Sequence, residues 1–299
     1  MDTRSLQTFL KVYDLRSFTK AAQELGYVQS TVTAQIQQLE QELGYPLFDR
    51  LGKHIYVTVL GEQFVSYAQQ IMRLSQQAKF LGKEPENMHG TLRVGVLESL
   101  LFSVLTNVLP QYNQAFPNVE VQVKMGRASD LLLWLKENKV DLVYYSHDQN
   151  RDPELCCCYS RREQLTFVAG PDHPLCRKKQ VSLQTLLQQP LIVTERSGIC
   201  YQRLRALAAE RGLTLQDTVE VDNTRAISEM VAQGMGCAFL PEYSVSRDVR
   251  HGALRVIPVE IPPQTYYSQI VYRKDKWAAP YMQALIEKIR QARPEERNL

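Results

Sequence analysis

The apolar pattern of this 299-residue chain changes near residue 90, and that change constrains its fold more than any other feature. Up to that point, apolar residues recur every three or four positions, which is the spacing of amphipathic helices. Beyond it, short strand-like apolar runs alternate with helix-like segments, which is typical of α/β sheets with mainly parallel strands. The sequence therefore predicts a small helical part followed by a larger α/β part.

Residues 18–25 and 29–43 predict two short helices joined by a tight turn, with Ser17 and Gly26 as caps of the first. The inward-facing apolar positions of the second helix are Val32, Ile36, Leu39 and Leu43. Its opposite face carries short polar side chains, and this arrangement lets a helix enter the major groove of DNA, although an ordinary surface helix has the same pattern. Residues 48–58 then resemble a wing, a hairpin whose basic side chains contact phosphates beside the groove.

A heptad repeat of apolar residues runs through residues 60–81. Its positions are Leu60, Phe64, Tyr67, Ile71, Leu74, Ala78 and Leu81. Another domain of the same chain could cover such a stripe, but a long seam between two compact regions favours a helix that pairs with a second copy. Polar residues up to Gly90 follow and predict a hinge.

The α/β part contains four predicted strand-to-helix junctions, each with a small hydroxyl or amide residue where the helix begins. Open parallel sheets bind ligands beyond the carboxyl ends of their strands, so we expect these junctions to face a cleft between two lobes. Helix N-termini there favour a carboxylate, sulfate-like or phosphorylated metabolite, whereas each residue taken singly is also a suitable N-cap. The predicted effector-binding residues are Glu98, Ser99, Ala128, Ser129, Arg196, Ser197, Gly198, Cys200 and Asn223.

The cysteines form neither a CxxC pair nor a Cys/His zinc spacing. The sequence therefore predicts no metal site and no cofactor, and the bland interpretation is a set of free thiols. Cys200 falls at or just inside a predicted helix start, where a thiolate would be stabilised. A thiol- or redox-sensing protein of the same fold is thus an alternative, with Cys237 the nearest cysteine that follows.

Other classes of protein are disfavoured. The sequence contains no GxSxG, P-loop, GxGxxG or HExxH motif, so we expect no enzyme and name no catalytic residue. A solute-binding module would leave residues 1–82 unexplained. No signal peptide and no apolar run of membrane-spanning length occurs, so we expect a cytoplasmic protein without a membrane partner.

Four segments together carry a family pattern, and they are residues 17–25 (SFTKAAQEL), 35–50 (QIQQLEQELGYPLFDR), 170–175 (GPDHPL) and 231–241 (VAQGMGCAFLP). On these segments the chain resembles the LysR-type transcriptional regulators over nearly its whole length. The resemblance implies an α+β multi-domain protein with a winged helix-turn-helix, a dimerising linker helix and a two-lobed α/β effector domain like a periplasmic solute-binding protein. It also implies a bacterial-type transcription regulator, a homo-tetramer that binds a double-stranded DNA operator and responds to a small metabolite, with RNA polymerase as a further candidate partner.

The domain boundaries follow from the pattern and the resemblance together. The DNA-binding domain is predicted at residues 1–58, the linker helix and hinge at 59–90, and the effector domain at 91–299. Within the effector domain, one lobe is expected at about 91–162 plus 267–299 and the other at about 163–266.

The reading helix departs from many relatives, which carry a proline and arginines where this chain has Ser30, Ala34 and Gln37. Glutamine pairs with adenine and threonine contacts the thymine methyl group, so Gln29, Thr33 and Gln37 predict an A/T-rich half-site. Residues 1–58 contain six basic and six acidic side chains, so the placement of bases matters more than net charge. The predicted DNA-contacting residues are Lys20, Gln29, Ser30, Thr31, Thr33, Ala34, Gln37, Arg50, Lys53 and Thr58.

Overall fold

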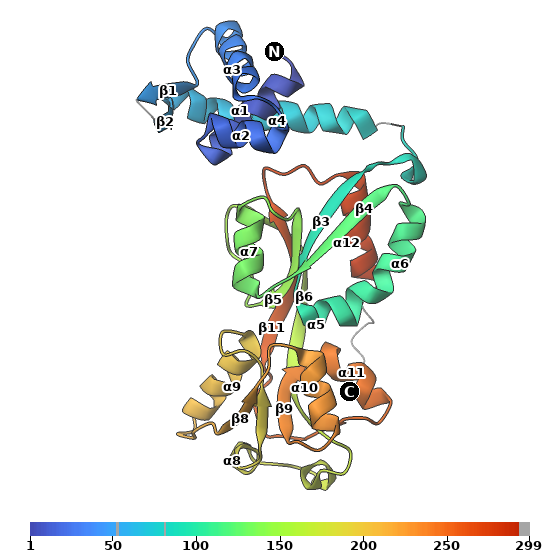
Figure 1. Ribbon diagram of the computed structural model, residues 1–299. Coiled ribbons are helices and arrows are strands. Elements are labelled where there is room, and N and C mark those ends of the chain that lie inside the picture. Colours follow the sequence, from blue (N-terminus) through green and yellow to red (C-terminus); the bar gives the residue numbers. More distant parts are fainter. Residues whose placement is uncertain (52–53, 81, 293–299) are drawn as a thin grey trace. The chain divides into compact units, whose positions relative to one another are not determined.

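The computed structural model describes residues 1–51, 54–80 and 82–292, and the chain divides into two compact units, residues 1–83 and 84–299 (Figure 1). The described part of the first unit consists of α1 (Thr3–Leu15), α2 (Phe18–Leu25), α3 (Gln29–Leu43), the strands β1 (Phe48–Leu51) and β2 (His54–Val57), and α4 (Val59–Phe80). β1 and β2 pair in antiparallel fashion, as in a wing. None of the described helices of the chain combines the length and the apolar character that spanning a membrane requires.

The helix-turn-helix pair forms where the sequence predicts it. Ser17 caps α2 by accepting a hydrogen bond from the Lys20 amide at 3.2 Å. Gly26 ends α2 with a φ of +69°, a left-handed conformation that glycine adopts without strain. The backbone can therefore reverse at once and start α3 at Gln29.

Phenylalanine rings lie at the centre of contacts in the core of the first unit. The ring of Phe9 on α1 lies 5.5 Å from the ring of Phe48 on β1 and 5.2 Å from the ring of Phe64 on α4. The apolar face of α3 closes this core with Ile36 and Leu39, each only 1% exposed. Because burying such a side chain contributes about 1.5–3 kcal/mol, this face holds α3 in place and leaves its polar face to solvent.

The second unit has two lobes, which we define by their strands. The first lobe contains β3 (Gly90–Val96), β4 (Val119–Met125), β5 (Leu142–His147), the helical segments α5 (Glu98–Leu100), η2 (Leu101–Leu105) and α6 (Thr106–Ala115), and the helices α7 (Ala128–Lys136) and α12 (Pro280–Ala292). The second lobe contains β7 (Leu191–Val193), β8 (Asp217–Glu220), β9 (Cys237–Pro241), β10 (Arg255–Val256), α8 (Leu183–Leu187), α9 (Ile199–Ala209), α10 (Thr224–Ala232) and α11 (Glu242–Arg250). Short 3-10 turns at Pro85–Asn87 and Pro174–Arg177 complete the described elements.

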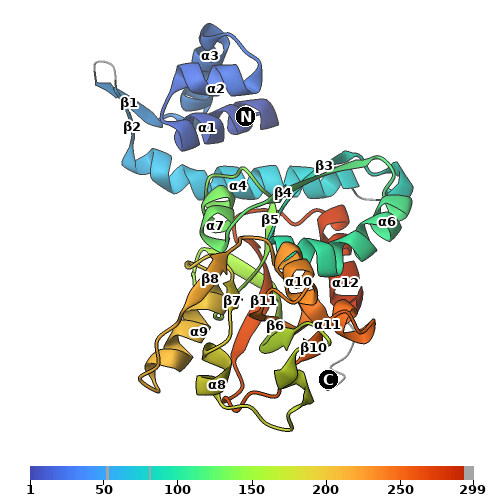
Figure 2. The same cartoon turned by 60° about the horizontal axis from the view of Figure 1, so that its bottom comes forward.

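Two long strands, β6 (Leu155–Ala169) and β11 (Thr265–Arg273), connect the lobes (Figures 1 and 2). β6 pairs with β11 over residues 155–164 and with β9 over residues 165–169, so one sheet of order β4-β3-β5-β11-β6-β9-β7-β8 runs through both lobes. Within each lobe the neighbouring strands are parallel, as predicted, whereas the two connecting strands are antiparallel to their neighbours.

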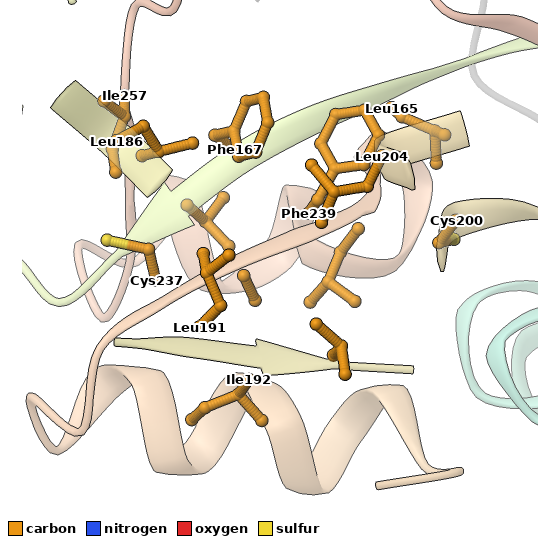
Figure 3. Close-up of a cluster of buried hydrophobic side chains, with 14 of the residues drawn as sticks. Leu165, Phe167, Leu186, Leu191, Ile192, Cys200, Leu204, Cys237, Phe239 and Ile257 are labelled. Atoms are coloured by element: carbon orange, nitrogen blue, oxygen red, sulfur yellow. The ribbon is translucent and has the colours of Figure 1, made fainter. Parts of the chain in front are cut away.

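Figure 3 shows the buried cluster that holds the second lobe together. Phe167 of β6 and Phe239 of β9 are register partners, and their rings stack with centroids 4.3 Å apart. Gly236 lies just before β9. A Cβ at this position would overlap the carbonyl group of Pro190, so only glycine lets β9 approach β7 here. This packing fixes the carboxyl ends of β7 and β9 side by side.

Candidate functional site

The outer face of α3 is polar and accessible. Gln29, Ser30, Ala34 and Gln37 are exposed, and Thr33 is half-exposed. Thr31, a further predicted contact, is also half-exposed. The Gln29 side chain is held at the start of the helix, where its Oε1 accepts a hydrogen bond from the Thr19 hydroxyl of α2 at 3.1 Å. Apart from that bond, the amides and hydroxyls of this face are available to a base edge in a groove.

The predicted phosphate contacts differ in how much the structure shows of them. Lys20 on α2 is exposed, and the described residues offer it no ion pair. Arg50 belongs to β1, but its side chain lies outside the described part, and Lys53 lies outside the described residues altogether. Lys20 is therefore the predicted basic residue whose side chain the structure describes, and that side chain is accessible.

Thr58, a further predicted DNA contact, has a structural role within the first unit. Its hydroxyl donates to the Pro46 carbonyl at 2.8 Å and accepts from the Gly61 amide at 2.9 Å. The side chain thus caps α4 and ties it to the segment before β1, so its hydroxyl is engaged within the chain.

The heptad positions of α4 fall into two groups, which corrects the expectation of a single exposed seam. Phe64 is 5% exposed and lies in the core of its own unit, and the half-buried Ile71 packs against that core. Leu60, Tyr67 and Leu74, seven residues apart, are 44%, 62% and 60% exposed. Of the remaining two predicted positions, Ala78 is exposed and Leu81 lies outside the described residues. The stripe available to a second copy is therefore Leu60, Tyr67, Leu74 and Ala78.

A cavity of about 690 Å³ lies in the second unit and is lined by both lobes. The structure brings into its wall all predicted effector-binding residues except one, and these are Glu98, Ser99, Ala128, Ser129, Ser197, Gly198, Cys200 and Asn223. They follow β3, β4, β7 and β8, whose carboxyl ends meet here. Arg127, Glu195, Asp222 and Thr224 of the predicted junctions also line it, and the wall residues that the prediction missed include Ser146, Thr194, Tyr243 and Tyr266.

The missed residues carry a common signal. Most of them stand within three residues of the carboxyl end of a strand, where α/β sheets place their ligand sites. Ser146 near the end of β5 and Tyr243 just after β9 could have been found by that rule. Tyr266 could not, because it lies near the amino end of β11 and reaches the cavity only through the crossing of the lobes.

Arg196 is the predicted residue that the cavity wall does not include. Its side chain is exposed, and its Nε bonds to Glu220 Oε2 at 3.2 Å. Its amide also donates to Glu220 Oε1 at 3.2 Å. Arg196 therefore fastens the loop after β7 to the end of β8, and the arginines in the wall are Arg127 and Arg151.

Cys200 corrects the expectation of a stabilised thiolate. The residue lies in the first turn of α9, but it is only 7% exposed, and burial raises the pKa of its thiol to about 12. Burial also raises the pKa of Cys237 to about 12. Cys237 Sγ lies 3.8 Å from His173 Nε2, in the core below β9. Both thiols are therefore protonated at neutral pH, which is opposite to the activation of a redox-sensing cysteine.

Hydroxyl groups join the lobes at the base of the cavity. The Tyr243 hydroxyl of α11 lies 3.1 Å from Ser99 Oγ and 3.0 Å from Ser146 Oγ, which belong to the first lobe. Burial raises the pKa of Tyr243 to about 12, so the phenol stays protonated, and in each bond either hydroxyl can be the donor. A second link is an ion pair between Arg203 of α9 and Asp148 after β5.

A third link uses the N-terminus of α10. Glu98 Oε2 accepts hydrogen bonds from the Thr224 amide at 3.1 Å and from the Thr224 hydroxyl at 2.8 Å. Asn223 caps the same helix, since its Oδ1 accepts from the Ala226 amide at 2.7 Å. The N-terminus of α10 is thus already occupied by a carboxylate of the first lobe, whereas α7 and α9 begin without a side-chain cap.

The two units together define a class of protein, a DNA-binding chain with a helix-turn-helix and a separate ligand cavity. Comparison with protein families then identifies the family to which the chain belongs. Residues 3–62 match the bacterial regulatory helix-turn-helix of the lysR family, and residues 85–294 match the LysR substrate binding domain. The chain belongs to the LysR family of transcriptional regulators, which is not a family of enzymes.

Individual relatives resemble the chain over almost its full length. It is 30% identical to the uncharacterized HTH-type transcriptional regulator YwqM of Bacillus subtilis, over 96% of this chain and 98% of that one. It is 26% identical to the HTH-type transcriptional activator CmpR of Synechocystis, over 94% and 92%. The structure of a full-length OxyR variant from Pseudomonas aeruginosa superposes with a TM-score of 0.66 at 21% identity, covering 99% of both chains, which is a likeness of fold.

Proposed function

We propose that this LysR-type regulator reads an operator with the outer face of α3 and that a small molecule in the cavity of the second unit changes its action on transcription. The observation that carries the first part is the exposed polar row of Gln29, Ser30 and Gln37, with the small Ala34 among them, on a helix whose opposite face is buried. The relatives are named as transcriptional regulators and one as an activator, which supports the second part.

The chemistry of α3 favours an A/T-rich half-site. Glutamine pairs bidentately with adenine, and a threonine methyl group contacts thymine, each worth about 1–3 kcal/mol of discrimination. Gln37 and Thr33 supply these groups in the middle of the helix, while Lys20 contacts a phosphate and carries no sequence preference. Ser30, Thr31 and Ala34 lie beside them in this assignment, and Arg50 and Lys53 of the wing remain proposed phosphate contacts.

An operator with two half-sites requires two copies of the chain. We assign the contact between copies to the stripe of Leu60, Tyr67, Leu74 and Ala78 on α4, whose apolar members are too exposed for a helix that stays alone in water. A tetramer, a pair of such dimers, is the proposed full assembly. We place the protein in the cytoplasm, where DNA and RNA polymerase are accessible to it.

The effector in this proposal carries an acidic group. Arg127 and Ser129 at the start of α7, with Ser197 and Gly198 before α9, offer a guanidinium group, hydroxyls and uncapped amides to such a group. The α10 end contributes less, because Glu98 and Asn223 already occupy its amides. The candidate metabolites are the intermediates of the pathway whose genes the protein controls.

The test is a gel-shift assay with the full chain on DNA that flanks its own gene. The expected result is a retarded complex that survives unrelated competitor DNA, and addition of intermediates from the pathway of the neighbouring genes changes its affinity or mobility. An enzyme or a solute-binding module of this fold would leave the DNA unshifted, and that outcome would contradict the proposal.

A further inference from the structure

The cavity wall contains buried polar atoms that the protein leaves without partners. Glu98 uses Oε2 for Thr224, but its Oε1 is buried and makes no hydrogen bond among the described residues. Thr194 is 6% exposed and its Oγ1 is likewise unpartnered within the described part. An unpaired buried polar atom costs about 1–3 kcal/mol, so a site that keeps such atoms is suited to receive a hydrogen-bonding partner from outside the chain.

The carboxylates of the wall divide into those that are paired and those that are not. Asp148 pairs with Arg203, and Asp152 pairs with Lys136 at 3.0 Å. Glu195 lines the cavity without an ion pair among the described residues, and the same holds for Asp222. The second-lobe side of the cavity therefore holds two carboxylates without an ion pair among the described residues, and Glu98 of the first lobe is a third.

Sheet topology places these groups close together. β7 and β8 are parallel neighbours, so Thr194 and Glu195 after β7 lie at the same sheet edge as Asp222 after β8. Thr224, two residues beyond Asp222, binds Glu98 and so brings that carboxylate to the same edge. An unpartnered hydroxyl and three carboxylates thus share one side of the wall.

The charges around Glu195 are of both signs, and a backbone hydrogen bond also favours its ionised form. Burial raises the pKa of Glu195, and the carboxylates of Asp222 and Glu220 raise it further, while Arg127 opposes the shift. Arg127 and Arg151 are the arginines of the wall. The wall therefore offers an acidic and a basic region to one ligand.

We propose that the cavity binds a small amino-acid-like molecule, with a protonated amine held by Glu98 Oε1, Glu195 and Thr194 and an acidic group held near Arg127 and Ser129. A protonated amine donates three hydrogen bonds and accepts none, which matches a group of acceptors that lack donors. This inference rests on the proposed effector function and names the chemical class of the effector.

A first test needs no ligand. In the free protein, Glu195→Gln removes a partly buried charge that has no ion pair among the described residues, while it keeps the shape of the side chain. We expect its thermal midpoint to rise by about 2–4 °C. Glu229→Gln is the matched control, because Glu229 is an exposed residue of α10 that pairs with Arg225 and does not line the cavity. An unchanged or lower midpoint for Glu195→Gln, relative to this control, would show that the chain itself uses the carboxylate and would overturn the proposal.

The second test uses pairs of compounds that differ by one amino group, norvaline against valerate and glutamate against glutarate. Thermal shift and calorimetry on the full chain should give at least tenfold tighter binding for the amino member of a pair. Glu195→Gln should abolish that preference, and Glu229→Gln should keep it. Equal or tighter binding of the compounds without the amine, or no binding of either member, would overturn the inference. A gel shift on the same preparations without ligand tests the DNA-binding function separately.

Discussion

The two candidate sites are built in different ways. The DNA-reading surface comes from one helix, α3, whose exposed and buried faces alternate along a single stretch of chain. The cavity comes from the ends of several strands of two lobes, and Glu98 and Thr224, which touch across it, lie 126 positions apart in the sequence. Helical periodicity determines the first site, whereas only the pairing of distant strands determines the second.

The largest expected effect tests whether α3 is held by its buried face. Ile36→Ala removes a 1% exposed side chain from the core of the first unit and should lower the free energy of unfolding by about 2–5 kcal/mol. Its neighbour Gln38 is exposed, so Gln38→Ala should change that free energy by less than about 0.5 kcal/mol. Chemical denaturation measures both, and equal effects would contradict the division of α3 into two faces.

The next effect tests whether the cavity depends on contacts between the lobes. Tyr243→Phe removes the hydroxyl that bonds to Ser99 and Ser146, and each lost bond should cost about 0.5–1.5 kcal/mol of unfolding free energy. Tyr267→Phe on β11 is the control, because the described residues give its hydroxyl no hydrogen bond. If both variants unfold at the same denaturant concentration as the unmodified protein, the Tyr243 hydroxyl does not stabilise the contact between the lobes.

A smaller effect separates positioning from base reading. Lys20→Ala should weaken binding to every DNA sequence alike and lower the slope of log affinity against log salt by about 0.9, since one phosphate contact is lost. Fluorescence anisotropy over a range of salt concentrations measures the slope. A change of sequence preference in this variant would place Lys20 among the base contacts instead.

The smallest effect is a pH dependence that originates at Glu195. Cys200 and the charged groups Arg127, Glu220 and Asp222 surround this carboxyl, and burial raises its folded pKa above the usual value of 4.5. Between the two pKa values the folded protein binds more protons than the unfolded one, so stability falls as pH rises from about 4.5 through the raised pKa. Glu195→Gln should lack that fall when both proteins are denatured across this range. If the stabilities of the two proteins changed with pH in parallel, the pKa of Glu195 would not be raised, and the prediction would be wrong.

Local elements could largely be predicted from the sequence. The helix at 29–43 has the predicted bounds because its apolar spacing is a local signal. The sequence predicts β6 only from Gln164, so the first nine residues of this strand (155–163) were missed. Arg161, Arg162 and Glu163 interrupt its apolar character, and the strand is stabilised by pairing with β11 a hundred residues later. The burial of Cys200 and of Phe64 likewise depends on tertiary packing, which periodicity cannot supply.

Site residues follow the same division. The strand-end rule placed Ser99, Ser129 and Ser197 at the cavity, but not the partners that engage them. Glu98 has an additional role that the sequence did not predict, because one oxygen of a carboxylate proposed to contact the effector binds the N-terminus of α10. Such contacts depend on the register of distant strands, so they can be predicted only once the fold is known.

The most direct test of the account is selection of bound sequences from a random DNA library by the full chain and by Gln37→Ala. The unmodified protein should enrich two A/T-rich half-sites about one helical turn, or a multiple of it, apart. Gln37→Ala should lose the preference at one adenine position in each half-site, by about 1–3 kcal/mol, while it keeps the stability of the unmodified protein. Half-sites centred on guanine, or a preference that Gln37→Ala leaves unchanged, would contradict the assignment of base reading to the outer face of α3.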